Sequence, residues 1–442
     1  MRAAELSLAL PRNDGSLAVS VARRLLEPLG PVDLPAWEAD HPALAWRRSG
    51  LLELTGRPDG PGLVAPIPLT SLADGLVLAL GALAPYADLP RNGAALLGER
   101  ARRLGLRRRG QVSANGSARL LKTLDGHLAL NLARMEDWES LPALLGGTAS
   151  EWCAVADLVA RQPTADLVAQ GHLLGLAIAP EGRPPSPARP FSIQPPLGAA
   201  TIRSRRPLVV DLSALWAGPL AASLLGAMGA RVVKIESLSR PDGARGGDPY
   251  FYDLLNGGKA SVALDFKDPE GVGRLRALID AADIVIESTR PRALEQLGID
   301  AASVARRGAT WVSVTAYGRT GVTANLIGFG DDTAVAGGAS AAMRRGWGES
   351  LFVGDAIADP LTGLAAAFAA WASWLGGGAR LVDIALADVI AYASGLGEVS
   401  GSELSAWQAF AEADKGPLYS LRQPLGIASP LGADTVSLLS EL

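Results

Sequence analysis

The stretch PLVVDLSALWAGPLAASLLGAMGARVVKIES, residues 207–237, decides the fold class. It opens with a short apolar run rich in β-branched residues, continues as an apolar helical segment from Pro219 to about Met228, and ends in a second such run, RVVKIES. Near-continuous apolar strands on either side of a helix are typical of a parallel sheet that helices cover on both faces. The stretch therefore predicts a strand–helix–strand unit.

The same alternation continues along the chain. Asp268 followed by Pro269 provides an N-cap and a proline at the first helical position, so a helix is expected in DPEGVGRLRALIDAAD. Further strands are predicted at SVALDF (261–266), DIVIES (283–288) and TWVSVTAYG (310–318). Residues 207–395 are therefore expected to form a doubly wound α/β domain around a mainly parallel sheet.

A proline-rich segment, residues 181–206, separates this domain from the chain before it. Six prolines in its first sixteen positions exclude a helix or a central strand, which indicates a linker. Residues 1–110 then form an N-terminal segment, and residues 396–442 form a C-terminal return segment.

Residues 111–180 predict a small α+β domain. Two alternating apolar segments, SARLLKTL and HLALNLAR, flank a turn at Asp125-Gly126, as expected for a pair of strands. Helical stretches follow around residues 138–145 and 152–174.

The chain also holds a weak internal repeat. Gly50 to Ser71 spans the same number of residues as Gly338 to Asp359, and the runs SLADGLVLALGAL and DPLTGLAAAFAAW follow the two copies. In this alignment Gly75 stands opposite Gly363. Only the second copy carries the carboxylate at this position, because Ser71 stands where the second copy has Asp359.

Composition bounds the function. The 442 residues are 48% hydrophobic and 19% charged with a net charge of −4, which indicates a well-buried globular protein without a field that attracts nucleic acid or acidic membranes. One cysteine, Cys153, excludes an internal disulfide, and the three histidines (His41, His127, His172) lack metal-ligand spacing. The N-terminus makes a poor signal peptide and the apolar stretches are too short for a membrane helix, so a soluble cytoplasmic protein is expected.

Several common binding motifs are missing or unsupported. Neither GxGxxG nor GxxxxGK[ST] occurs, so a dinucleotide site and a P-loop lack support. The arginines of ERARRLGLRRRGQ, from Arg100 to Arg109, have no aromatic residues between them, which favours a solvated helix face over a nucleic-acid site.

The candidate reacting group is Asp359, in the stretch GDAIADPLTG (354–363). An aspartate before a proline and an apolar run is typical of a helix N-cap. The same position keeps a carboxylate ionised, and an ionised carboxylate can act as a nucleophile. Composition alone gives Asp355, Asp331 and Asp332 similar claims.

Taken together, the motifs resemble the class III CoA-transferases, the CaiB/BaiF group. The resemblance runs from VVDLSALWAGPLAASLLGAMGARVVKIES through LLNGGKASVALDFKDPEG, ADIVIESTRPRALEQLGI, VSVTAYGRTG, GFGDD and GDAIADPLTG to RLVDIALADV. In that family an aspartate four residues ahead of a glycine is the nucleophile, and Asp359 with Gly363 matches this spacing whereas Asp355 does not. The small domain, which usually follows the sheet domain, here precedes it.

The resemblance implies a site with no metal and no redox cofactor, in which coenzyme A is substrate and product. It implies an acyl-CoA and a carboxylic acid as partners, and a homodimer. Three positions depart from common family residues: Trp216, Ser237 and Gln296. The residues implied in CoA binding are Trp216, Ala217, Leu264, Asp265, Lys267, Ser288, Thr289 and Arg290.

Three hypotheses follow. The first is an acyl-CoA:carboxylate CoA-transferase that works through an aspartyl acyl anhydride and an aspartyl-CoA thioester. The second is a 2-methylacyl-CoA racemase, which needs two bases, although Asp331 stands where racemases carry a histidine. The third is a catalytically inactive relative that binds acyl-CoA.

Overall fold

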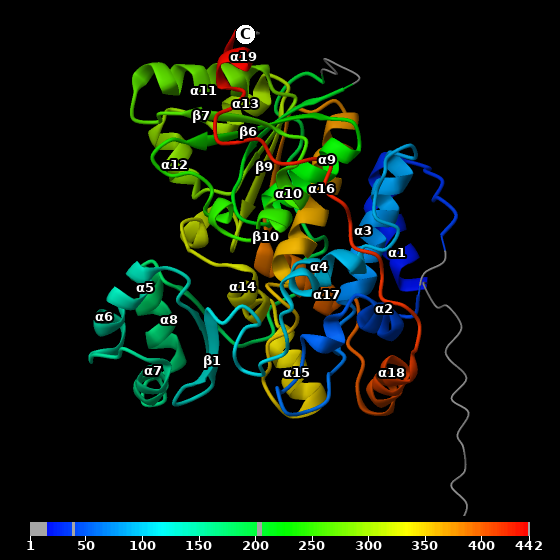
Figure 1. Ribbon diagram of the computed structural model, residues 1–442, viewed down its shortest axis with the longest axis vertical. Coiled ribbons are helices and arrows are strands. Elements are labelled where there is room, and N and C mark those ends of the chain that lie inside the picture. Colours follow the sequence, from blue (N-terminus) through cyan, green and yellow to red (C-terminus); the bar gives the residue numbers. More distant parts are fainter. Residues whose placement is uncertain (1–15, 38–39, 201–205, 441–442) are drawn as a thin grey trace, which may run out of the picture.

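A computed structural model of the protein describes residues 16–37, 40–200 and 206–440. A large α/β domain stands above a smaller domain, and helices from the N-terminal segment lie against the large domain on one side (Figure 1). No helix within the described ranges is long and apolar enough to cross a membrane.

The large domain is built on a seven-stranded sheet in the order β4-β10-β9-β8-β5-β6-β7. All neighbouring pairs are parallel except β4 with β10, which is antiparallel, so the predicted mainly parallel doubly wound sheet is confirmed. The strands are β4 (Ser192–Ile193), β5 (Leu208–Leu212), β6 (Arg231–Ser237), β7 (Ala260–Leu264), β8 (Ile284–Glu287), β9 (Thr310–Thr315) and β10 (Arg380–Ala385). The proline-rich segment thus also contributes β4, as an edge strand, where proline-rich chain is tolerated.

The strand order reverses between β5 and β8, because β6 and β7 extend the sheet on one side of β5 and β8 to β10 on the other. In open parallel sheets the crevice at the carboxyl ends of such strands is the usual ligand site. The turn after β5 and the loop after β8 both lie at this crevice, and the N–H of Ala214 donates to Oγ of Ser288 across it (3.0 Å).

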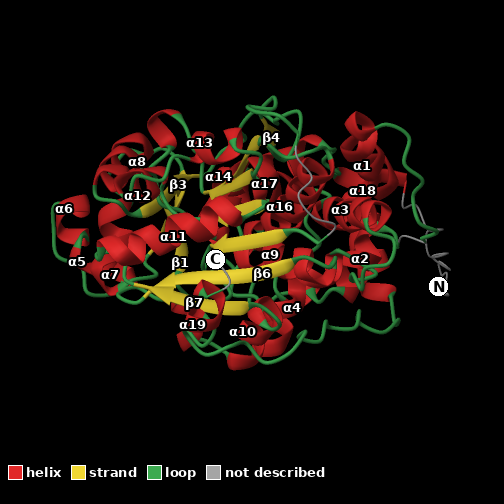
Figure 2. Ribbon diagram, turned by 90° about the horizontal axis from the view of Figure 1, so that it is seen from above, coloured by secondary structure: helices red, strands yellow, loops and turns green. Residues whose placement is uncertain are grey.

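Helices cover both faces of the sheet (Figure 2). Successive residues of a strand alternate between two cores: Ile284 and Ile286 belong to one, and Val285 to the other. The helices of this domain are α9 (Ala217–Ala227), α10 (Pro249–Asn256), α11 (Pro269–Ala281), α12 (Pro291–Gln296), α13 (Ala301–Arg306), α14 (Gly330–Ala336), α15 (Ala339–Trp347), α16 (Ala358–Leu375) and α17 (Leu386–Gly395). As predicted, Asp268 caps α11 by accepting from the N–H of Gly271 (3.2 Å).

The small domain has its own three-stranded antiparallel sheet, β1-β2-β3, and its own apolar core. The expected helix over 152–174 is two helices, because Pro163 in extended conformation separates them. Its elements are β1 (Ala118–Lys122), β2 (His127–Asn131), β3 (Ala177–Pro180), α5 (Met135–Glu139), α6 (Leu141–Leu145), α7 (Trp152–Val159) and α8 (Thr164–Leu173).

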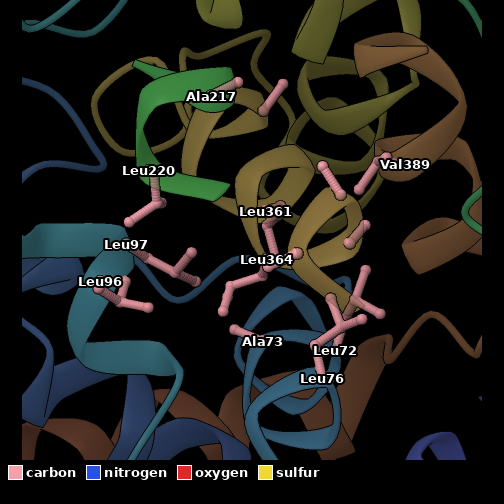
Figure 3. Packing of buried hydrophobic residues seen from close by; sticks show 14 of the residues in the cluster. Leu72, Ala73, Leu76, Leu96, Leu97, Ala217, Leu220, Leu361, Leu364 and Val389 are labelled. Carbon is pink, nitrogen blue, oxygen red and sulfur yellow. The ribbon is translucent and has the colours of Figure 1, made fainter. Parts of the chain in front are cut away.

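The N-terminal segment packs into the large domain. Its helices are α1 (Ser16–Leu26), α2 (Pro42–Arg48), α3 (Leu69–Leu83) and α4 (Ala94–Leu104). Leu72 and Leu76 of α3 and Leu97 of α4 lie beside Leu361 and Leu364 of α16 in one buried cluster (Figure 3). The C-terminal helices α18 (Gly401–Ala413) and α19 (Thr435–Leu439) complete the chain.

The two copies of the proposed repeat have similar local geometry. Gly50 and Gly338 both precede a helix with positive φ (89° and 99°). A Cβ on Gly75 would meet the carbonyl oxygen of Ala18 on α1 at 2.7 Å, and one on Gly363 would meet that of Ala217 on α9 at 2.8 Å. Each glycine therefore lets its helix pack closely against a preceding one.

Candidate active site

Asp359 lies in the first turn of α16 but is not its N-cap. The helix begins at Ala358, and the residue before it, Ile357, already has right-handed helical dihedrals and no side-chain capping bond. The N-cap interpretation is therefore wrong. The helix starts earlier than local sequence predicts because tertiary contacts fix the preceding loop.

The Asp359 side chain instead meets the first residues of two other helices. The backbone amide groups of Ala217 (α9) and Gly330 (α14) interact with its carboxylate. A Cβ on Gly330 would lie 2.2 Å from Oδ2 of Asp359, so only glycine leaves room for the carboxylate. Amide groups and helix dipoles at such positions favour a negative charge.

Burial opposes that stabilisation. Desolvation raises the pKa of Asp359 to about 6, against the lowering effects of Arg100 and the two amides. Asp355 adds to the rise because it is a like charge. The residue nevertheless keeps some exposure, whereas its neighbours in the loop and helix are buried. With a pKa of about 6, Asp359 is mostly ionised at neutral pH.

The loop before α16 is held in an unusual conformation. Ala356 has a φ of 44°, in the left-handed region that residues with a side chain rarely adopt. Its N–H donates to Oδ1 of Asp331 (2.9 Å), and the N–H of Gly354 donates to Oγ1 of Thr55 (3.1 Å). These contacts fix the direction in which α16 begins.

Asp355 is fully buried and paired with Arg100 of α4. Nε of Arg100 donates to Oδ2 at 2.7 Å and Nη2 to Oδ1 at 2.5 Å. Asp355 has both oxygens engaged in this pair, which leaves Asp359 as the partly exposed carboxylate of the GDAIADPLTG stretch.

Asp331 and Asp332 connect this region to the small domain. Nδ2 of Asn115 donates to Oδ2 of Asp331 (3.2 Å), and Nδ2 of Asn131 donates to Oδ1 of Asp332 (3.0 Å). Burial raises the pKa of each carboxyl to about 7. Both aspartates therefore fasten loops together rather than point into open space.

Buried charges hold the turn after β5. Nζ of Lys234 donates to the carbonyl of Ser213 (2.9 Å) and pairs with Asp242 (2.9 Å), which accepts from the N–H of Leu215 (3.0 Å). Leu215 itself has a φ of 68°. The turn that presents Ala217 to Asp359 is therefore fixed by ionic contacts that sequence reasoning did not find, since the lysine and its partners are spread over three separate stretches.

The residues implied in CoA binding separate into two groups. Trp216, Ala217, Ser288, Thr289 and Arg290 follow β5 or β8 at the strand-order reversal, and of these Ala217 interacts with Asp359. Leu264, Asp265 and Lys267 follow or end β7, two strands away from β5 at the sheet edge.

Their exposure differs as well. Trp216 is buried beneath the guanidinium of Arg100, and Leu264 is buried at the end of its strand. Asp265 and Lys267 are exposed. Arg290 is partly exposed, and its pKa is lowered by burial and by the nearby cations. These nearby cations are Arg292, Arg240 and Arg134.

Among the described residues no group of His, Cys, Asp and Glu side chains is arranged to hold a metal ion. The site instead brings together one partly exposed carboxylate, backbone amides and one arginine. Sequence reasoning named the carboxylate and missed Arg100, Asn115 and Asn131, which lie outside the sheet domain.

Comparison with known proteins bears on the same region. Residues 207–397 match the model of CoA-transferase family III. The chain is 31% identical over 200 residues to a succinate–glutarate CoA-transferase of Agrobacterium fabrum, a match that covers 41% of this chain and 50% of the relative. It is 30% identical over 174 residues to a formyl-CoA:oxalate CoA-transferase of Rhodopseudomonas palustris, covering 35% and 39%.

A solved structure of a CaiB/BaiF family protein from Brucella suis is 29% identical, covers 44% of this chain and 54% of that chain, and has a TM-score of 0.37. The chain thus spans about half the length of the relatives that it matches. The sheet domain, residues 207–397, is therefore similar in sequence to CoA-transferase family III.

Proposed function

We propose that the protein is an acyl-CoA:carboxylate CoA-transferase in which Asp359 is the nucleophile. The observation that carries the proposal is the position of this carboxylate: partly exposed, facing the amides of Ala217 and Gly330, with a pKa of about 6. It is ionised at neutral pH, and its raised pKa keeps it more nucleophilic than an ordinary aspartate.

The reaction starts with attack of an Asp359 oxygen on the thioester carbonyl of the donor. The C–S bond breaks, which gives a mixed anhydride and the CoA thiolate. The thiolate then attacks the aspartyl carbonyl, forms an aspartyl-CoA thioester and releases the donor acid. The acceptor carboxylate attacks this thioester, breaks its C–S bond and forms a second anhydride with release of the CoA thiolate. The thiolate then attacks the acceptor acyl carbon, which gives the acceptor acyl-CoA and frees the Asp359 carboxylate.

The amides of Ala217 and Gly330 support the two steps that attack the aspartyl carbonyl, because negative charge then develops on an aspartyl oxygen in the tetrahedral intermediate. Each step exchanges one activated acyl group for another, so neither a metal nor a redox cofactor is needed. The relatives named above act on succinate, glutarate, formyl-CoA and oxalate, and short dicarboxylates are therefore the first acceptors to test. A homodimer and a cytoplasmic location stay predictions.

One observation favours the racemase hypothesis: the pKa of Asp331 is about 7, which suits a general base near neutral pH. Its oxygens, however, accept from the backbone of Ala356 and the side chain of Asn115. A base needs a free oxygen next to the substrate α-carbon, so we place the transferase first.

Mass spectrometry of the full chain with succinyl-CoA tests the proposal. We expect an acyl or CoA adduct on the peptide that contains Asp359, and transfer of CoA to added glutarate or oxalate. Asp359→Asn should lower exchange by several orders of magnitude, because the covalent step is lost. Asp355→Ala should keep part of the activity, and Ser71→Ala, at the equivalent position of the first repeat, should behave like wild type.

Deuterated water separates the alternatives. A transferase leaves the α-carbon of a 2-methylacyl-CoA untouched, whereas a racemase incorporates deuterium there. Rapid α-exchange that needs no acceptor acid would refute the transferase. Binding of acyl-CoA without adduct, exchange or deuterium would identify the inactive relative.

A further inference from the structure

Arg100 joins both walls of the site. Its guanidinium binds the buried Asp355 through two hydrogen bonds, of 2.7 and 2.5 Å. It also lies over the ring of Trp216, with its central carbon 4.4 Å from the ring centre. Asp355 is four residues ahead of Asp359 in the loop that enters α16. Trp216 directly precedes Ala217, whose amide faces the Asp359 carboxylate.

The place of Arg100 is itself fixed. Its helix, α4, begins with the N–H of Ala94 donating to the buried Asp74 (2.9 Å). The neighbouring Glu99 pairs with Arg422 of the C-terminal return segment (2.6 Å). Trp216 is supported from another side by Phe251, edge-on with ring centres 5.2 Å apart.

The charges around Asp359 are unequal in number. Two further carboxylates, Asp331 and Asp355, interact electrostatically with Arg100, and Asp355 also raises the pKa of Asp359. The positive charge of Arg100 opposes this rise. Arg100 is itself mostly covered, with 20% of its side chain exposed, so solvent screens its charge only weakly. Its loss would leave several acidic groups without this counter-charge.

We propose that Arg100, carried by the N-terminal segment, is the positioning residue that holds the Asp359 loop against the Trp216–Ala217 turn and keeps Asp359 ionised. This proposal rests on the function proposed above. It means that the N-terminal segment, which lies outside residues 207–397, helps to position the reacting carboxylate. It also explains why both an arginine fork and a flat ring are present, because a guanidinium can pair with a carboxylate in its plane while it stacks on an aromatic face.

The test compares four variants by the pH dependence of kcat/KM for CoA exchange. Arg100→Met keeps the length and apolar contact but removes the charge, so the acid limb should move up by about one pH unit or more. Activity at pH 7 should fall about tenfold to a hundredfold, since the loop also loses its anchor. Asp355→Asn removes a like charge, and its acid limb should move down.

The double variant Arg100→Met/Asp355→Asn removes both charges. Its acid limb should return towards that of wild type while kcat stays reduced, because the link between the two walls is still missing. Arg100→Lys keeps the charge without the fork, so its acid limb should stay near that of wild type with a lower kcat. If Arg100 had only a structural role, the acid limbs of Arg100→Met and Asp355→Asn would not move in opposite directions.

Arg103 provides a matched control on the same helix. It pairs with Asp248 (3.7 Å) and lies over the ring of Tyr250 (4.5 Å), the same kinds of contact directed at α10 instead of the site. Arg103→Met should leave the pH profile and kcat unchanged. Equal losses in Arg103→Met and Arg100→Met would overturn the proposal.

A second readout keeps this inference separate from the proposed function. Carbodiimide with an amine labels protonated carboxyl groups, and the label on the Asp359 peptide is followed against pH by mass spectrometry. If wild type shows no CoA exchange, the function fails while labelling still reports on Arg100. If Arg100→Met folds but labels the Asp359 peptide with the same pH dependence as wild type, the role of Arg100 is refuted.

Discussion

Asp74 shows at a single residue how this protein uses buried carboxyl groups. It lies on α3 and accepts a hydrogen bond from the N–H of Ala94. Burial raises its pKa to about 7, and Asp40 adds to the rise as a like charge. In the folded protein Asp74 therefore keeps its proton at pH values where the unfolded chain has lost it.

The sign of the resulting pH dependence is fixed. Because the folded state binds the extra proton, the free energy of unfolding should fall as pH rises from about 4 to about 7, by on the order of 1 kcal/mol per pH unit for one such group. Asp74→Asn keeps an oxygen for the Ala94 N–H and should flatten this slope in urea unfolding. Asp300→Asn is the control of opposite sign, since hydrogen bonds from Ser303 lower the pKa of Asp300. A slope that Asp74→Asn leaves unchanged would contradict the assignment.

At the scale of elements, the sequence predicted well what depends on neighbours in the chain. The helix start at Asp268 and the strand runs depend on local patterns, and the structure confirms them. The N-cap role of Asp359 was wrong because the start of α16 depends on Asp331 and Thr55, which hold the preceding loop. Arg100 was read as part of a solvated helix face because nothing in its surroundings reveals a partner 255 residues away.

The meeting of α14 with α16 supplies a prediction of its own. Gly330→Ala places a methyl group 2.2 Å from Oδ2 of Asp359, which is too close, so the carboxylate must move. Exchange activity should fall by about a hundredfold, the typical effect of a displacement near 1 Å, while the fold persists. Gly273→Ala in α11 is the control, because nothing lies within 4 Å of its added Cβ and alanine favours a helix. Full activity in Gly330→Ala would show that the observed carboxylate position is not the reactive one.

For the whole molecule, the packing of α3 against α16 sets an order of events during synthesis. The ribosome completes α3 at Leu83 long before it reaches Ala358, the first residue of α16. Until α16 has been synthesised, Leu72 and Leu76 lack their α16 partners and expose apolar surface that can bind other molecules. Contacts between segments so distant in sequence form slowly, since the loop between them must close first.

A dye that fluoresces on apolar surfaces detects the state in which α3 is not yet covered by α16. The fragment of residues 1–180 should bind the dye and associate, because it lacks α16, which covers the face of α3 that carries Leu72 and Leu76. The fragment of residues 111–180 has a separate core and should fold without binding dye. If the longer fragment stays monomeric and dye-free, α3 finds cover within its own half. Otherwise the apolar face of α3 stays uncovered until α16, Ala358–Leu375, has emerged, so a helix made early in synthesis is among the last to be buried.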